Sequence, residues 1–180
     1  MSTALKNRMT ADEFLRWAEG KEGRWELHDG APVMMSPERM AHIRTKARAV
    51  AALEGAVRNA NLLCEVFADG LSVQVDSGAI FEPDASVVCG PRRSDDTIVI
   101  TDPTIVVEVL SPGDTIGAVE EKLRQYFENG SRLAWVVNPM TKTALVYHGP
   151  SADKLLTLKD GLDGEAVIPG FLLPLEQVFS

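Results

Sequence analysis

The sequence predicts an α/β or α+β fold in which a mixed β-sheet carries helices on its faces. Segments with apolar residues at helical spacing alternate along the chain with short runs of β-branched residues, and Gly, Pro, Asn and Asp separate them. The chain has 180 residues, of which 45% are hydrophobic and 24% charged, as in an ordinary globular protein. No shift in composition divides it, so we expect one domain over residues 1–180.

The N-terminal part predicts a helix, a hairpin and a longer helix. Residues 10–13, Thr-Ala-Asp-Glu, have the form of a capping box at the start of a short helix. The Asp29-Gly30 pair separates two alternating runs and predicts a β-hairpin. Ser36-Pro37 favours a helix start, and the apolar residues that follow at three- and four-residue spacing predict a long helix with one buried stripe.

The middle of the chain predicts strands followed by one helix. Residues 62–67, 71–75 and 79–88 are typical of strands, and the short loop between the first two predicts that they are antiparallel neighbours. Residues 105–110 form an aliphatic run that predicts a strand buried on both faces, and residues 116–128 follow it as an amphipathic helix.

The C-terminal part predicts shorter elements. Residues 131–137 and 144–148 are expected to be strands, since Asn and Pro follow the first of them. Residues 155–158 and 167–168 are expected to be two small final strands, and residues 174–178 a terminal helix.

Charge and cysteine content limit the classes of function. The formal net charge of −8 is the opposite of the basic surplus that long duplex DNA usually requires. Cys64 and Cys89 lie in apolar runs, which suits small buried side chains in a reducing compartment better than a disulfide framework. Neither a signal-peptide core nor an apolar run of membrane length is present, so we expect a cytoplasmic protein without a membrane span.

One segment is locally basic despite the acidic total. Between residues 38 and 58 the basic side chains outnumber the acidic ones, and Arg44, Lys46 and Arg48 lie at its centre. This segment is either a solvated helix face or a surface that binds nucleic acid.

Three residues could supply the chemistry of a metal-dependent hydrolase. Glu108 lies inside the buried strand, where a lone carboxylate needs a cationic or protic partner. Asp84 could reach the same point if its strand is a neighbour, and two carboxylates close together favour a cation between them. Lys122 lies at the edge of the buried stripe of the following helix. The alternatives are structural ion pairs for the acids and an extended surface lysine.

Several short motifs follow one another in a fixed order along the chain. They are Met9-Thr10, Glu13-Phe14, Trp25-Glu26-Leu27, Asp29-Gly30, Met35-Ser36-Pro37, His42, Pro83-Asp84, Val107-Glu108-Val109-Leu110-Ser111-Pro112, Lys122 and Tyr126. In these motifs the sequence resembles the Uma-two family of restriction-endonuclease-like proteins, once catalogued as a domain of unknown function and part of the PD-(D/E)XK nuclease superfamily. The resemblance spans about residues 9–139.

The resemblance implies a restriction-endonuclease-like mixed central sheet and Mg²⁺- or Mn²⁺-dependent hydrolysis of phosphodiester bonds. By position, Asp84 and Glu108 match the two metal-binding acids of the superfamily motif, and Glu26 matches an additional acid that could support the metal. The superfamily lysine two residues after the second acid is replaced by Leu110, and Lys122 would take its place in orienting the water.

The resemblance also implies partners. His42 and Tyr126 would contact the phosphate or the metal ligands, the substrate would be DNA, and a homodimer would allow both strands of a duplex to be cut. Three residues depart from the family pattern. Ala118 and Val119 stand shortly before the lysine where the family tends to have an acid and an arginine, and Asn138 stands before Pro139 where the family has an aspartate. The alternatives are a non-catalytic module that keeps the nuclease fold for binding or self-association, and a hydrolase acting on another phosphorylated substrate.

Overall fold

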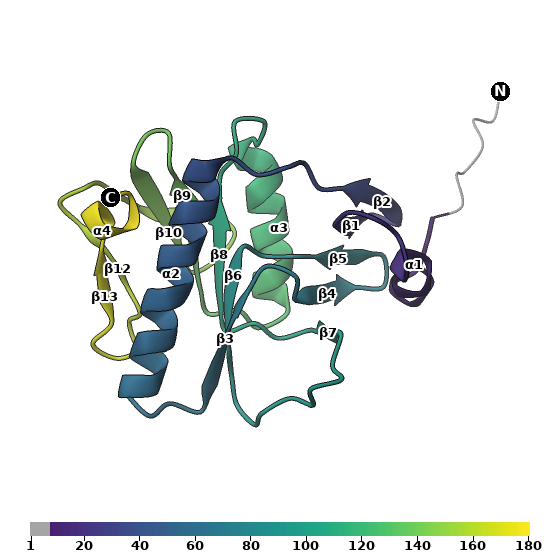
Figure 1. Ribbon diagram of the computed structural model, residues 1–180, viewed down its shortest axis with the longest axis horizontal. Helices are drawn as coiled ribbons and strands as arrows, with labels where there is room; N and C mark the ends of the chain where they lie inside the picture. Colours follow the sequence, from purple (N-terminus) through teal and green to yellow (C-terminus); the bar gives the residue numbers. More distant parts are fainter. Residues whose placement is uncertain (1–7) are drawn as a thin grey trace.

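The computed structural model describes residues 8–180 and contains two adjoining β-sheets, with helices on either side of the larger one (Figure 1). The helices are α1 (Ala11–Ala18), α2 (Met40–Asn59), α3 (Ile116–Glu128) and α4 (Leu175–Val178). The larger sheet has the order β11-β10-β9-β8-β6-β3, formed by β11 (Ala152–Leu156), β10 (Thr143–Tyr147), β9 (Leu133–Asn138), β8 (Ile105–Val109), β6 (Ala85–Cys89) and β3 (Cys64–Ala68).

The second sheet lies toward the N-terminal end. Its order is β2-β1-β5-β4-β7, formed by β2 (Ala31–Met34), β1 (Trp25–His28), β5 (Ala79–Phe81), β4 (Ser72–Asp76) and β7 (Val99–Ile100). A two-stranded sheet of β12 (Gly161–Asp163) and β13 (Leu172–Pro174) precedes α4. Parallel and antiparallel pairs occur in both larger sheets, so the predicted mixed α+β class is confirmed, with two large sheets and one small sheet instead of a single one.

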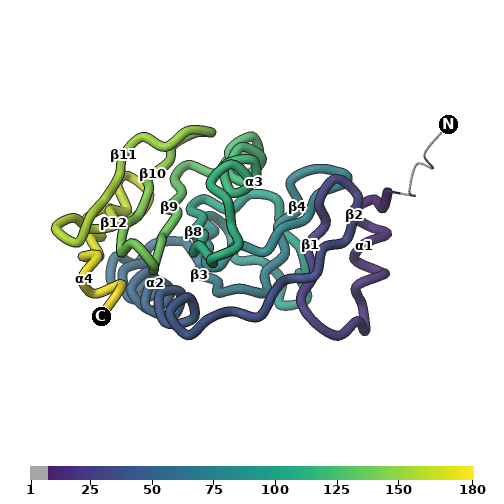
Figure 2. The backbone as a smooth tube through the Cα atoms, turned by 90° about the horizontal axis from the view of Figure 1, so that it is seen from above, coloured from purple at the N-terminus to yellow at the C-terminus, as the bar shows by residue number. Residues whose placement is uncertain are grey.

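The six-stranded sheet is buried on both faces. Seen from above, α2 and α3 lie on opposite sides of it (Figure 2). Leu53 of α2 packs with Val107 of β8 in one apolar cluster, and Leu123 of α3 packs with Val106 in another. Successive residues of a strand point to opposite faces, so the aliphatic run of β8 follows from its place between two helices.

The N-terminal elements form as the sequence predicts. The Thr10 hydroxyl accepts a hydrogen bond from the Glu13 amide at 3.3 Å, and the Glu13 carboxylate accepts one from the Thr10 amide at 2.8 Å, so the capping box is present. The β1–β2 hairpin turns at Asp29 and Gly30, with φ of 48° and 75°. Two consecutive positive φ values are those of a type I′ turn, which Asp-Gly favours.

The long helix α2 begins later than predicted. Its N-cap is Arg39 and its first residue is Met40, whereas the sequence indicated a start at Ser36-Pro37. Residues 35–39 run without regular structure, and the Glu38 side chain forms ion pairs with Arg24 and Lys46. These ion pairs fix the Glu38 side chain in the segment that precedes the helix.

The predicted strand 79–88 is two strands in different sheets. The chain leaves β5 after Phe81, crosses through Glu82-Pro83-Asp84 and enters β6 at Ala85. Pro83 has no amide hydrogen to donate to a sheet, which explains the break. The prediction that residues 62–67 and 71–75 are antiparallel neighbours is also wrong, because β3 pairs with β6 and β4 pairs with β5 and β7.

Two further expectations are corrected. Residues 167–168 are not a strand, and the final sheet is formed by β12 and β13 instead. Cys64 and Cys89, expected to be separate buried thiols, are opposite each other in the β3–β6 register and form a disulfide. The sequence did not reveal that their strands are neighbours, and without that pairing the two side chains had no reason to meet.

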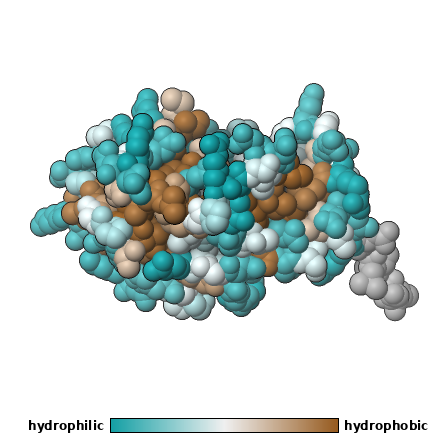
Figure 3. Space-filling model, turned by 90° about the horizontal axis from the view of Figure 1, so that it is seen from below, coloured by the Kyte–Doolittle hydropathy of each residue, from teal (hydrophilic) through white to brown (hydrophobic). Residues whose placement is uncertain are grey.

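The surface is mixed in character. The view from below shows hydrophilic residues over most of the molecule, with apolar residues visible between them (Figure 3). Within residues 8–180, none of the helices has the length and apolar character needed to cross a bilayer.

Candidate active site

A cavity of about 440 Å³ opens where the two sheets adjoin. The residues that line it come from both sheets and from both large helices, and they include Glu26, His42, Asp84, Glu108 and Lys122. Residues predicted from distant parts of the sequence to act together therefore lie around one space. Their catalytic roles remain predictions.

The strand register brings the two principal acids together. β6 and β8 are antiparallel, with Ala85 opposite Val107, so Asp84 and Glu108 are the next pair along the ladder. Asp84 directly precedes β6, and its Oδ2 accepts a hydrogen bond of 2.7 Å from the Val109 amide. Both acids are 8% exposed, so each carboxylate is nearly removed from bulk water.

Lys122 lies between two acids from different sheets. Its Nζ donates a 2.9 Å hydrogen bond to Glu26 Oε1 and lies 3.3 Å from Glu108 Oε1. The side chain is only 14% exposed, so the amine faces the cavity wall and not bulk solvent. Burial lowers the pKa of Lys122, but attraction to Glu108 and Glu26 outweighs it and raises the pKa above its ordinary value. Lys122 is therefore a stable cation and hydrogen-bond donor.

The two acids bound to Lys122 have opposite pKa shifts. Burial raises the pKa of Glu108 from 4.5 to about 7, although Lys122 partly opposes it. Burial also raises the pKa of Glu26, but the hydrogen bond with His28, the charge of Lys122 and the amide of Glu82 outweigh it and bring the pKa to about 2. Glu26 is thus a permanent anion that anchors Lys122, while Glu108 changes charge near neutral pH.

Tyr126 is buried behind Glu108. Its hydroxyl donates a long hydrogen bond of 3.4 Å to Glu108 Oε1, and none of the side chain is exposed. It can orient the carboxylate of Glu108 but cannot reach a phosphate in the cavity as the structure stands.

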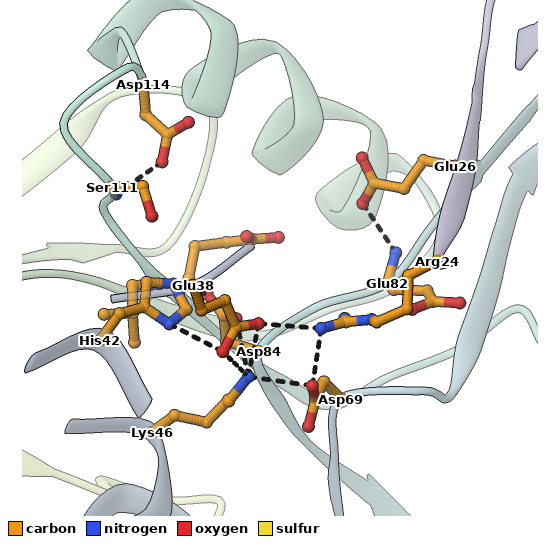
Figure 4. Close-up of polar contacts among 12 residues, drawn as sticks. Arg24, Glu26, Glu38, His42, Lys46, Asp69, Glu82, Asp84, Ser111 and Asp114 are labelled. Carbon is orange, nitrogen blue, oxygen red and sulfur yellow. Dashed lines mark hydrogen bonds and ion pairs between the residues drawn. The ribbon is translucent and has the colours of Figure 1, made fainter. Parts of the chain in front are cut away.

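A second ionic cluster lies beside Asp84 (Figure 4). Glu38 accepts hydrogen bonds from Lys46 Nζ at 2.6 and 2.7 Å, and from an Arg24 nitrogen at 2.8 Å. Both cations also reach Asp69, at 2.9 Å from Lys46 and 2.7 Å from Arg24, and Arg24 Nε donates to Glu82 at 3.0 Å.

Sequence reasoning gave no role to four members of this cluster, Arg24, Glu38, Asp69 and Glu82. A signal was available for Glu82, which stands two residues before Asp84 in the segment that crosses between the sheets. For Glu38 no local signal exists, because Ser36-Pro37-Glu38 has the pattern of a helix start.

His42 points to the cavity and not to the apolar core. Its Nε2 lies 3.3 Å from Asp84 Oδ2, and its Nδ1 lies 3.3 Å from Glu38 Oε2. Burial lowers the pKa of His42, but the hydrogen bond and charge of Asp84 and the charge of Glu38 outweigh it and raise the pKa. The sequence left both orientations of this side chain open.

The three basic residues predicted to bind nucleic acid do not form one surface. Lys46 is buried in the ionic cluster, whereas Arg44 is exposed, and Arg48 is half-buried and donates to the Val178 carbonyl near the C-terminus at 3.2 Å. Positions 44 and 48 share a helix face, and position 46 lies on the opposite one. The three side chains therefore do not share one surface, and their contact with nucleic acid stays a prediction.

The cavity is strongly acidic. Eight of the lining residues are acids, and Lys122 is the one lysine or arginine among them. Phosphodiesters carry a negative charge, so this lining would repel them unless a cation is present. Within residues 8–180, Glu108 Oε2 and Asp84 Oδ1 receive no hydrogen bond, so one oxygen of each acid is available as a ligand. Such a donor set fits Mg²⁺ or Mn²⁺.

The fold is shared with a nuclease-type protein of known structure. A crystal structure described as "a putative nuclease belonging to DUF820", from Anabaena variabilis ATCC 29413, matches with a TM-score of 0.81 at 19% identity. The match covers 95% of this chain and 97% of that one, so it shows the same fold over nearly the whole chain.

Sequence comparison gives the family. The model of the Uma2 family, described as "Putative restriction endonuclease", matches residues 11–176, and the chain belongs to this family. An uncharacterized protein of Synechocystis sp. (strain ATCC 27184 / PCC 6803 / Kazusa) is 27% identical over 162 residues, which are 89% of this chain and 79% of the relative. The resemblance inferred from motifs is confirmed.

Proposed function

We propose that this protein hydrolyses phosphodiester bonds of nucleic acid, in particular DNA, with Mg²⁺ or Mn²⁺. The observation that carries the proposal is the meeting of Asp84, Glu108 and Lys122 in one acidic cavity, where register places the acids opposite each other and the amine lies 3.3 Å from Glu108. Membership of a family described as "Putative restriction endonuclease" supports the same chemistry.

Asp84 and Glu108 would hold the metal, each through its free oxygen. When bound, the metal would neutralise charge on the phosphate and make a water molecule more acidic. Asp84 is fixed for this task by the Val109 amide, and Glu108 is supported by Tyr126. Both contacts limit the freedom of the carboxylates, which improves a metal site.

Lys122 would act as a donor and not as a base. Because two acids raise its pKa, it keeps its proton at neutral pH and can hydrogen-bond to charge that develops on the phosphate. Glu26 would hold the amine in place, since its two oxygens already accept from Lys122, the Glu82 amide and His28. Glu26 is thus a positioning residue in this proposal, and the sequence-based idea of a further metal ligand is the alternative.

The experiment is incubation of the protein with single-stranded DNA, duplex DNA and RNA, each with EDTA, Mg²⁺ or Mn²⁺. Wild type should cleave DNA only with metal, and Asp84→Ala and Glu108→Gln should lose cleavage by at least about a hundredfold. Glu121→Gln is the matched control, because Glu121 lines the same cavity but is exposed and pairs with Arg124. Equal cleavage by wild type and Asp84→Ala would reject the proposal.

The second candidate is a nuclease fold used for binding or self-association. One observation favours it: Lys122 and Lys46 already neutralise part of each acid cluster, which reduces the need for a metal. This candidate predicts that wild type neither cleaves nucleic acid nor binds Mn²⁺. The homodimer and the cytoplasmic location stay predictions, and light scattering of the purified chain tests the first of them.

A further inference from the structure

A histidine and two carboxylates converge beside the proposed magnesium site. Glu38 precedes α2, His42 lies on its first turn, and Asp84 enters from the segment between the sheets. Each residue offers one ligand atom, and these atoms all lie within 4.8 Å of one another. That spacing is compatible with a single ion that contacts all three.

His42 has the burial and the neighbours that a metal ligand requires. The residue is 6% exposed, and its Nδ1 is fully buried without a hydrogen-bond partner among residues 8–180. Buried polar atoms normally have partners, because an unpaired one loses its hydration without compensation. The ring lies between Glu38 and Asp84, with one nitrogen facing each carboxylate at 3.3 Å. The unpaired nitrogen is therefore directed at an acid and not at apolar side chains.

The charges around His42 do not balance. Four carboxylates lie in this cluster, those of Glu38, Asp69, Glu82 and Asp84, and two permanent cations, Arg24 and Lys46, contact them. An imidazole that binds a metal ion is neutral, and in that form the cluster keeps a surplus of two negative charges among side chains that are partly or fully buried. A divalent cation carries the charge that would cancel this surplus.

We propose that Glu38, His42 and Asp84 bind a first-row transition-metal dication of the Mn²⁺ or Zn²⁺ class. Imidazole nitrogen favours these ions, whereas Mg²⁺ prefers oxygen ligands alone. The inference deepens the proposed function, on which it rests for the biological use of the ion, since Asp84 contributes to both sites. Asp84 Oδ2 lies 3.3 Å from His42 Nε2, and Oδ1 receives no hydrogen bond among residues 8–180, so this carboxylate would have an oxygen for each site.

Lys46 is the competitor for this site. Its Nζ contacts both oxygens of Glu38 and lies 3.7 Å from Asp84 Oδ1. Glu38 Oε2 faces both this amine and His42 Nδ1, so Lys46 already uses an oxygen that the ion would need. Lys46 also donates a 2.9 Å hydrogen bond to Asp69, and this bond would remain if Glu38 turned toward an ion. Replacing Lys46 by a neutral residue should therefore strengthen metal binding, the opposite of the effect expected for a residue that supports the site.

The test uses the full chain, freed of metal with EDTA, and Mn²⁺ as the probe. Titration followed by electron paramagnetic resonance counts bound Mn²⁺, and electron spin-echo modulation detects a nitrogen nucleus coordinated to it. Wild type should show nitrogen modulation, and His42→Gln should lose both the modulation and one equivalent of Mn²⁺. His148→Gln is the matched control, since His148 also lies between two carboxylates but far along the chain on the surface, and it should retain the modulation.

Two further variants sharpen the result. Lys46→Gln should bind Mn²⁺ at least about tenfold more tightly, because a positive charge next to the ion is removed. Glu108→Gln should lose cleavage but keep the nitrogen modulation, which separates this site from the proposed magnesium site.

If wild type binds Mn²⁺ without nitrogen modulation, the inference fails, whatever the nuclease assays show. If modulation is present and no nucleic acid is cleaved, the site stands and the proposed function fails. If His42→Gln does not fold, the presence or absence of nitrogen modulation in the wild-type spectrum decides whether the inference holds.

Discussion

Glu108→Gln should stabilise the metal-free protein at alkaline pH, because the carboxylate is held where its ionised form is disfavoured. Burial raises the pKa of Glu108 from 4.5 to about 7. The folded chain therefore binds more protons than the unfolded chain between these two values, so the free energy of unfolding falls as the pH rises through this window and levels off above about pH 7. Gln has the size of the protonated side chain and does not titrate.

The magnitude follows from the two pKa values. Linkage gives a difference in unfolding free energy between variant and wild type of about 1 kcal/mol near pH 5 and about 3 kcal/mol near pH 8. The ionised Glu108 side chain thus reduces the stability of the metal-free fold at the pH where it would bind a metal, as is common for functional groups. Near pH 4 the two proteins should be almost equally stable.

Urea unfolding followed by tryptophan fluorescence, at several pH values and with EDTA, measures this difference. The reasoning would be refuted if Glu108→Gln were less stable than wild type near pH 8, since that would mean that the ion pair with Lys122 stabilises the fold more than burial of Glu108 destabilises it. Glu121→Gln serves as the control, because Glu121 is exposed and should show no comparable gain.

Three other outcomes are expected. Mn²⁺ should raise the melting temperature of wild type, since it binds only the folded chain, and Asp84→Ala should abolish most of the rise in differential scanning fluorimetry. Hydrogen bonds to Glu165 and Asp153 raise the pKa of His148 above 6.5. The stabilisation by protonated His148 is therefore complete below about pH 6.5 and is lost as the pH rises through the folded pKa, so the free energy of unfolding of His148→Gln should depend less on pH. Cys64→Ser should lower the unfolding free energy by about 3 kcal/mol under oxidising conditions, because the disulfide closes a loop with a sequence separation of 25, and a reductant should remove the difference between variant and wild type.

The principal site residues could be predicted because local patterns mark them. Glu108 is an acid within an aliphatic strand, and Asp84 follows a proline at a strand start. Both patterns are visible without tertiary information, since an isolated carboxylate in a buried strand requires a partner wherever the strand lies. Lys122 could be suggested from its place on the helix wheel, although its contact with Glu26 depends on a second sheet that the sequence did not predict.

Other parts of the site could not be predicted because they depend on long-range contacts. Glu38 has the local appearance of the first turn of a helix, but it lies outside the helix and forms ion pairs with Arg24 and Lys46. Lys46 looks like a surface cation in a basic segment, and its burial depends on Asp69 from the turn after β3. The disulfide has the same origin, since the pairing of β3 with β6 is a property of the whole sheet.

The contact between Glu26 and Lys122 connects the two sheets. Glu26 belongs to β1, and Lys122 lies on the helix that covers the six-stranded sheet. This 2.9 Å ion pair therefore joins the two sheets. The same amine lines the cavity and lies 3.3 Å from Glu108. A phosphate that attracts Lys122 would therefore compete with the contact that joins the two sheets, so binding in the cavity would act on the boundary between them.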